Sequence, residues 1–134
     1  MAVAADEVIQ VRNQHDIVNA RHAVRTRAVA AGFRLVDQTK IVTAASELAR
    51  NTLSYGGGGT LRIETLEDGL RTGLRLTFED HGPGIADIGL ALTDGYTTSG
   101  GMGLGLSGSK RLVNEFDIWS KQGEGTRVTV TRWT

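Results

Sequence analysis

Residues 60–85 read TLRIETLEDGLRTGLRLTFEDHGPGI, and this stretch decides the fold. Apolar and polar residues alternate over Thr60–Leu66 and again over Leu74–Glu79, as in strands with one buried face. The intervening Glu67-Asp68-Gly69 is typical of a tight turn, so we expect an antiparallel hairpin. The second strand ends at Asp80, directly before a turn that contains the only proline of the chain.

The segments on either side of this hairpin show helical or alternating patterns. The spacing predicts helices over Asp16–Ala31, from an N-cap at Asp37 to Tyr55, over Leu104–Phe116, and a helical turn at Ile88–Leu92. It predicts further strands at Val8–Val11, Asp117–Ser120 and Thr126–Arg132. Helices do not follow every strand, which disfavours a parallel doubly wound sheet. We expect an α+β fold: a two-layer α/β sandwich with a mixed, mostly antiparallel sheet and helices on one face, formed as one domain over residues 1–134.

Composition excludes several classes of protein. Fifteen basic residues balance fifteen acidic ones, so the excess or stripe of basic charge that is usual in nucleic-acid binders is missing. The chain has no cysteine, which excludes disulfides and cysteine-based zinc sites and agrees with a reducing compartment. No apolar run approaches the roughly 18 residues of a membrane span, and the N-terminus lacks the pattern of a signal peptide. We expect a cytoplasmic protein that binds neither nucleic acid nor membrane.

Glu47 and Asn51 lie four residues apart in the helix predicted to end at Tyr55, so both project from one face. A carboxylate and a carboxamide placed in this way suit a triphosphate site. The carboxylate can accept a proton from an attacking hydroxyl, and the carboxamide oxygen can ligate Mg²⁺. The same two residues also fit an ordinary solvated helix face.

The turn after Asp80 has the composition of a base-binding segment. A carboxylate at a strand end can accept a hydrogen bond from an exocyclic amino group such as that of adenine. Gly82 and Gly84 would let the base approach the backbone closely. Asp, Gly and Pro also dominate ordinary surface turns, which is the alternative interpretation.

Two further glycine clusters follow. Residues 99–106 read SGGMGLGL, and alternate glycines before a helix can direct N–H groups at a phosphate. The cluster lacks the preceding strand of a dinucleotide fingerprint and the Gly-Lys-Ser/Thr of a P-loop, so we interpret Thr93–Gly103 as a lid over phosphates. Residues 123–126 read GEGT; Thr126 can reach the base through its hydroxyl or a water, or can simply belong to a hairpin turn.

Taken together and in this order, the four segments resemble the GHKL superfamily of gyrase-, Hsp90-, histidine-kinase- and MutL-type ATP sites. The stretches SELARN, EDHGPGI, DGYTTSGGMGLGL, KRLVNEFDIWS and GEGT further resemble the RsbT type of anti-sigma-like serine/threonine kinase, a stressosome switch kinase. The resemblance implies a Bergerat ATP-binding fold and a protein kinase that uses ATP and Mg²⁺.

The resemblance also assigns expected roles to residues. It implies that Glu47 is the catalytic base, that Asn51 binds Mg²⁺, that Asp80 binds the adenine amino group, and that Thr126 supports Asp80. The implied ATP-binding residues are Asn51, Ser54, Asp80, Gly82, Gly84, Ile85, Gly101, Met102, Gly103, Leu104, Gly105 and Thr126.

The family likeness implies a serine of a STAS-domain antagonist protein as substrate and a serine phosphatase as the activated partner in partner switching. An anti-sigma factor that binds a sigma subunit directly, with ATP-tuned affinity, remains an alternative. An ATPase that uses water as the acceptor is a third. All three would need the same ATP site. Arg50 or Lys110 could add positive charge near the phosphates, which the sequence does not decide.

Overall fold

The structure, a computed structural model, describes residues 1–92 and 104–134, without the side chains of Leu104 and Gly105. Its elements are β1 (Ala2–Val11), α1 (Gln14–Ala30), α2 (Leu35–Ser54), β2 (Gly59–Asp68), β3 (Arg71–Asp80), α3 (Ile88–Ala91), α4 (Leu104–Arg111), β4 (Glu115–Lys121) and β5 (Gly125–Trp133). The five described strands form one sheet in the order β1-β2-β3-β5-β4, and each neighbouring pair is antiparallel.

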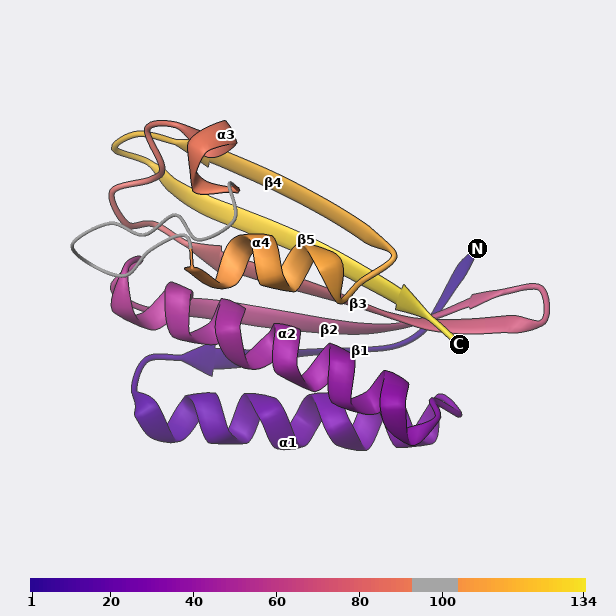
Figure 1. Ribbon diagram of the computed structural model, residues 1–134. Helices are drawn as coiled ribbons and strands as arrows, with labels where there is room; N and C mark the ends of the chain where they lie inside the picture. Colours follow the sequence, from indigo (N-terminus) through magenta and orange to yellow (C-terminus); the bar gives the residue numbers. More distant parts are fainter. Residues whose placement is uncertain (93–103) are drawn as a thin grey trace.

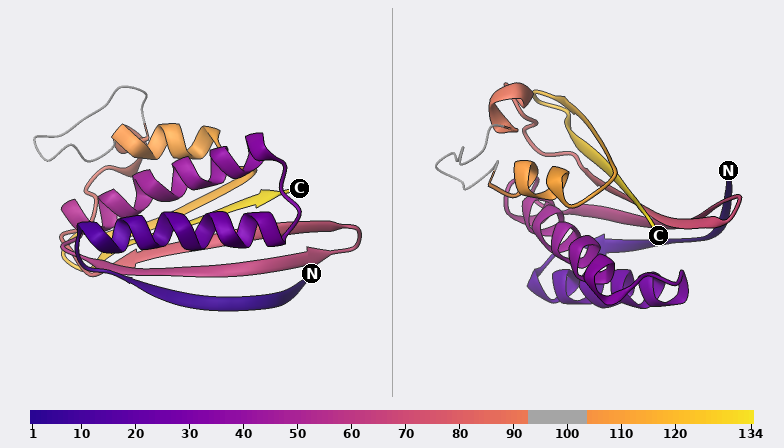
Figure 2. Two further views of the ribbon diagram at one scale, coloured as in Figure 1. Left: turned by 90° about the horizontal axis from the view of Figure 1, so that it is seen from below. Right: turned by 45° about the vertical axis from the view of Figure 1, so that its right-hand side comes forward.

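The sheet forms one layer, and helices α1, α2 and α4 form the other on a single face (Figures 1 and 2). In the hairpin of β2 and β3, Leu61 lies opposite Phe78 and Ile63 opposite Leu76, and all four side chains are buried against the helices. Burial of one such side chain stabilises the fold by about 1.5–3 kcal/mol. The predicted two-layer α+β architecture is confirmed.

The predicted helix over Leu104–Phe116 is wrong in its second half. Helix α4 ends at Arg111, and β4 begins at Glu115. The backbone N–H of Asn114 donates to the carbonyl of Thr131 at 2.9 Å, and Phe116 lies opposite Val130. Pairing with β5 satisfies the backbone groups of this segment and still lets Phe116 pack against the core. The segment therefore forms a strand although its apolar residues also have helical spacing.

The sequence suggested Asp37 as an N-cap, and this prediction is wrong. Helix α2 begins at Leu35, and its N-cap is Arg34. The Asp37 carboxylate instead accepts a hydrogen bond from the Arg132 guanidinium, which holds the pKa of Asp37 below its usual value. Arg132 also donates to the carbonyl of Leu112 at 2.9 Å. One arginine of β5 therefore ties the start of α2 to the residue that follows α4.

None of the described helices is long and apolar enough to cross a bilayer.

Candidate functional site

The ends of one helix and two strands meet at one end of the molecule: the C-terminal end of α2, the end of β3 and the start of β5 (Figure 1). The hairpin register places Asp80 opposite Gly59 and the next strand places it opposite Thr126. Residues from three of the four predicted motifs are thus brought together by the sheet and by the loop that follows α2.

Asp80 is the buried carboxylate of this region. The residue is 8% exposed, and its side chain accepts a hydrogen bond from the backbone N–H of Gly82 at 2.9 Å. Burial raises the pKa of Asp80 above the usual 3.8, while the N–H groups of Gly82 and Thr126 act in the opposite direction. Backbone N–H groups therefore fix the carboxylate, and its remaining lone pairs can accept from a donor such as an amino group.

Glycines pack tightly around Asp80. A Cβ atom added at Gly56 would lie within 3.0 Å of the Asp80 side chain, and one added at Gly82 would lie within 3.0 Å of Gly56. Gly125 has a φ of 132° and a Cβ there would meet the Asp80 carbonyl oxygen. A larger residue at any of these three positions would displace the carboxylate or its neighbouring backbone.

A second layer of hydrogen bonds holds the turn after Asp80. The Ser120 and Thr126 hydroxyls are 2.8 Å apart, and Ser120 Oγ accepts from the Ile85 N–H at 2.7 Å. The Tyr55 hydroxyl donates to the Gly84 carbonyl at 3.1 Å. The sequence analysis assigned no role to Ser120 or Tyr55, because only the register of β4 with β5 and the end of α2 bring them here. Thr126 lies opposite Asp80 in the sheet, as its predicted supporting role requires.

Asn51 and Glu47 lie near the end of α2, four residues apart. The Asn51 Nδ2 atom is buried and has no hydrogen-bond partner among the described residues. A buried, unpaired amide is costly, and such groups in native proteins often mark a bound partner. Which of the two amide atoms occupies this position is an assignment, so either the carboxamide oxygen or the nitrogen can serve a ligand.

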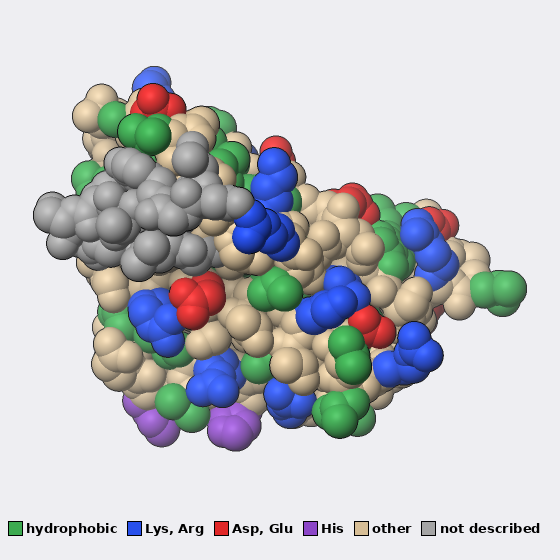
Figure 3. Space-filling view, viewed as in Figure 1, with side chains coloured by type: hydrophobic (Ala, Val, Ile, Leu, Met, Phe, Trp, Pro, Cys, Tyr) green, Lys and Arg blue, Asp and Glu red, His purple; other side chains and the backbone are tan. Residues whose placement is uncertain are grey.

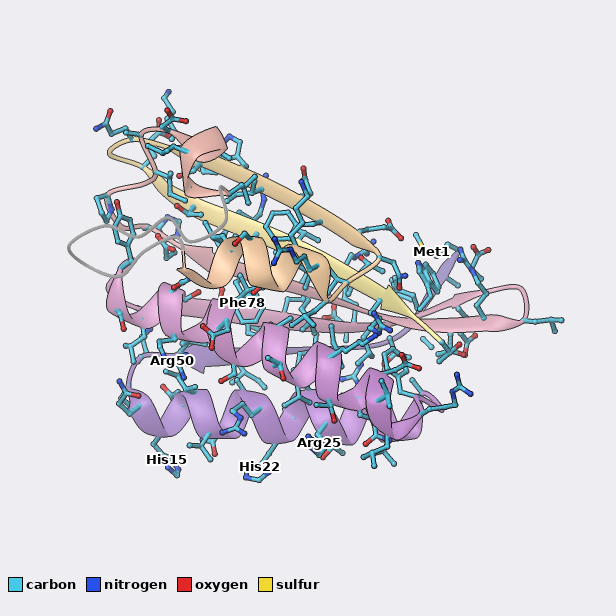
Figure 4. The ribbon with its side chains drawn as sticks, in the orientation of Figure 1. Met1, His15, His22, Arg25, Arg50 and Phe78 are labelled. Atoms are coloured by element: carbon cyan, nitrogen blue, oxygen red, sulfur yellow. The ribbon has the colours of Figure 1, made fainter. Side chains whose placement is uncertain are left out.

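Glu47 is half-exposed and accepts a hydrogen bond from Arg50 at 2.9 Å. Figure 4 shows Arg50 near the C-terminal end of α2. The carboxylate is thus accessible to a second macromolecule, while the guanidinium restrains its rotamer. An exposed pair of this kind contributes little to stability.

The carboxamide of Asn51 fits a magnesium ion that is shared with phosphates. Among residues 1–92 and 104–134, no group of three or more His, Asp or Glu side chains gathers that could hold a metal alone. Protein sites for Mg²⁺ with nucleotides typically supply one or two oxygen ligands and take the rest from phosphate and water. Asn51 can provide one such ligand.

The other predicted residues are placed as follows. Gly84 and Ile85 are buried in the turn after Asp80, whereas Ser54 is exposed at the last position of α2. Leu104 and Gly105 begin α4, and Gly101, Met102 and Gly103, with the rest of the predicted lid, lie outside the described residues.

Comparison with known proteins gives one family and several relatives. Residues 36–133 match the family model described as histidine kinase-, DNA gyrase B-, and HSP90-like ATPase. The chain is 46% identical over 125 residues to the serine/threonine-protein kinase RsbT of Bacillus subtilis, which covers 93% of this chain and 94% of the relative. It is 30% identical over 105 residues to an anti-sigma F factor of Anoxybacillus flavithermus, over 73% of this chain and 70% of the relative.

Solved structures share the fold at low sequence identity. The RsbU and RsbW domains of Rv1364c from Mycobacterium tuberculosis match with a TM-score of 0.65 at 19% identity, over 96% of this chain but only 32% of that longer chain. The SiaB–SiaC complex from Pseudomonas aeruginosa matches with a TM-score of 0.58 at 13% identity, over 98% of this chain and 91% of the other.

Proposed function

The chain belongs to the family of histidine kinase-, DNA gyrase B- and HSP90-like ATPases, and on this premise we propose that it is an RsbT-type protein kinase that transfers the γ-phosphate of ATP to a serine of a STAS-domain protein. The likeness to the Bacillus subtilis kinase over almost the whole of both chains carries this proposal. The geometry around Asp80 supports it, because a fixed, buried acceptor at a strand end suits an adenine amino group.

In the proposed reaction, the serine hydroxyl oxygen of the substrate attacks the γ-phosphorus of ATP. The bond from that phosphorus to the β,γ-bridging oxygen breaks, and ADP leaves with this oxygen. The hydroxyl proton passes to the Glu47 carboxylate. Phosphoryl transfer depends chiefly on positioning and charge compensation, so a modest base is sufficient. Glu47 suits this role because its accessible side chain can meet a hydroxyl that another protein presents.

Asn51 would ligate Mg²⁺, which when bound offsets phosphate charge. Asn51 and Glu47 lie one helical turn apart on α2, so metal binding and proton acceptance would occur on one rigid element. Gly101, Met102, Gly103, Leu104 and Gly105 would cover the phosphates. Gly82, Gly84 and Ile85 would line the base, with Ser54 at the rim.

The likeness to the Bacillus subtilis kinase also supports a proposal for regulation. We propose that phosphorylation of the STAS-domain protein releases the kinase, which then binds and activates a serine phosphatase. A cytoplasmic location, where ATP is available, is part of this proposal.

A second candidate function is direct sequestration of a sigma subunit. The similarity to an anti-sigma F factor over 73% of the chain favours it, and the same nucleotide site would then tune affinity for the sigma subunit.

The test is transfer of radiolabelled γ-phosphate to a purified STAS-domain protein encoded beside this chain. We expect labelling of one serine, its absence when that serine is replaced by alanine, and its loss in Asn51→Ala and Asp80→Ala. If the wild type labels no STAS-domain protein but binds a purified sigma subunit in an ATP-dependent manner, the kinase proposal fails and the second candidate stands.

A further inference from the structure

One face of the sheet carries no helix in the part of the chain that the structure describes (Figure 2). The side chains on this open face are mostly polar, as alternation along the strands requires. They enclose a shallow cavity of about 510 Å³, lined by Val8, Thr60, Arg62, Glu64, Arg75, Thr77, Glu79 and Arg127.

A second cavity, of about 300 Å³, continues the first toward the end of the molecule where α2 ends. The two share Thr60 and Glu79, and the second adds Arg12, His81 and the run Gly56–Gly59. We call the combined surface the sheet furrow. From Glu64 to Thr60 it follows β2 for four residue steps, about 14 Å at the usual strand rise. That length matches an extended segment of about four residues.

The charge of the sheet furrow is unbalanced. Its lining includes four arginines but only two glutamates, whereas the whole chain has a net charge of zero. Glu64 is already paired, since Arg75 donates to both of its oxygens at 2.9 and 3.0 Å. Glu79 and Arg127 are 3.7 Å apart, a loose contact.

Three arginines of the furrow can still pair with a ligand: Arg12, whose side chain has no acidic partner among the described residues, and Arg62 and Arg127, whose ion pairs with Asp6 and Glu79 are exposed. The Arg12 side chain donates to Gln10 and makes no ion pair within residues 1–92 and 104–134. Arg62 is exposed and contacts Asp6 at 3.4 Å, outside the cavity lining. Guanidinium groups of this kind bind carboxylates in bidentate fashion.

Both tryptophans of the chain lie on this same side of the sheet. Trp119 is 42% exposed, and the Arg127 guanidinium lies 5.5 Å from its ring centre. Trp133 lies over Gly73, with Arg71 at 4.1 Å from its ring. Exposed tryptophan next to arginine is the composition that is enriched at the energetic centres of protein interfaces.

We propose that the sheet furrow is a docking surface for an extended, acidic segment of a protein partner. Carboxylates of the segment would pair with Arg12, Arg62 and Arg127, and Trp119 would cover its apolar atoms. The furrow and the candidate ATP site adjoin at Gly56, which packs against Asp80. The furrow side chains on the strands lie on the other face of the sheet, because Glu79 and Asp80 are neighbours in β3 and point to opposite faces. The proposal therefore does not rest on the proposed function.

The test is an NMR titration of the full chain with a hexapeptide of alternating glutamate and threonine. Amide shifts should be confined to the open face and to the two tryptophan side chains, and the affinity should fall at high salt. The double variant R62S/R127S should bind about 2- to 30-fold more weakly, as expected for two solvent-exposed ion pairs.

The matched control is R21S/R25S, which removes the same charge from α1. Arg25, labelled on α1 in Figure 4, donates to Gln38 of α2, and Figure 3 shows basic side chains dispersed over this helix-bearing face. The control variant should bind the peptide as the wild type does, and Asp80→Asn should bind it equally well. The amide spectrum of each variant reports whether it is folded.

Three results of the titration would overturn the proposal. They are the absence of saturable shifts with the acidic peptide, equal loss of binding in both double variants, and equal binding of a lysine–threonine peptide. Concentration-dependent self-association that R62S/R127S abolishes would also overturn it, since the occupant would then be a second copy of the chain.

Discussion

Replacing Asp80 by asparagine should weaken nucleotide binding without unfolding the protein. The asparagine oxygen can still accept the Gly82 N–H, which lies 2.9 Å from the present carboxylate oxygen. Its NH₂ group would then face the adenine amino group, donor against donor. Loss of a hydrogen bond to a charged acceptor costs about 1.5–3 kcal/mol, which corresponds to an affinity about 10- to 150-fold lower.

The same substitution should not lower the free energy of unfolding, and can raise it. Burial raises the pKa of Asp80 above 3.8, so its ionisation is less favourable in the folded than in the unfolded state. The stability contributed by this group is present below the unfolded pKa and is lost as the pH rises through the folded pKa. At neutral pH the amide removes this penalty, and the free energy of unfolding without nucleotide should be equal to or higher than that of the wild type.

Titration with a fluorescent ATP analogue and urea denaturation measure the two quantities. The matched control is Glu79→Gln, which removes a carboxylate one residue away on the opposite face and should leave nucleotide affinity unchanged. An Asp80→Asn variant that binds nucleotide within about twofold of the wild type would refute the assignment of Asp80 to the base.

Three further changes test other parts of the account. Gly56→Ala should lower both nucleotide affinity and stability, the latter by about 1–3 kcal/mol, because the new Cβ meets the Asp80 side chain; Gly108→Ala, where a Cβ meets nothing within 4 Å, should be neutral or stabilising in urea denaturation. Asn51→Ala should abolish the difference in ATP affinity between magnesium and EDTA buffers, and a preserved difference in calorimetry would exclude Asn51 as a metal ligand. The hydrogen bond from Arg75 lowers the pKa of Glu64 below 4.5, so the ionised Glu64 stabilises the fold above that pH, and this contribution is lost as the pH falls through the lower folded pKa. On acidification below pH 4.5, the wild type should therefore lose more free energy of unfolding than Glu64→Gln. Equal losses in urea denaturation would contradict this.

Local patterns were sufficient for much of the fold. Alternation over β2 and β3 predicted the hairpin, since inward Leu61 and Phe78 must share one face. Helical spacing also predicted a helix to Tyr55, and α2 ends at Ser54. The end of α4 was not predictable in the same way, because it depends on a hydrogen bond between Asn114 and Thr131, which are distant in sequence.

The candidate site likewise contains residues that the sequence indicates and residues that only the structure reveals. Asp80, Gly82 and Thr126 were predicted because their residue types and positions carry recognisable chemistry. Ser120 and Tyr55 were missed, since serine and tyrosine occur in many settings and only the register of β4 with β5 and the end of α2 bring them to the turn. The packing of Gly56 against Asp80 also needs the three-dimensional structure, because nothing in a run of four glycines indicates which one meets the carboxylate.

If Asp80 and Asn51 bind the nucleotide and Glu47 accepts the proton, the variant Glu47→Gln should separate binding from transfer. In a single-turnover assay with the STAS-domain substrate, we expect ATP affinity within about twofold of the wild type. The rate of transfer should fall by about 10²- to 10⁴-fold, the usual contribution of a general base. An unchanged transfer rate, or a parallel loss of ATP binding, would contradict the role of Glu47 as the base.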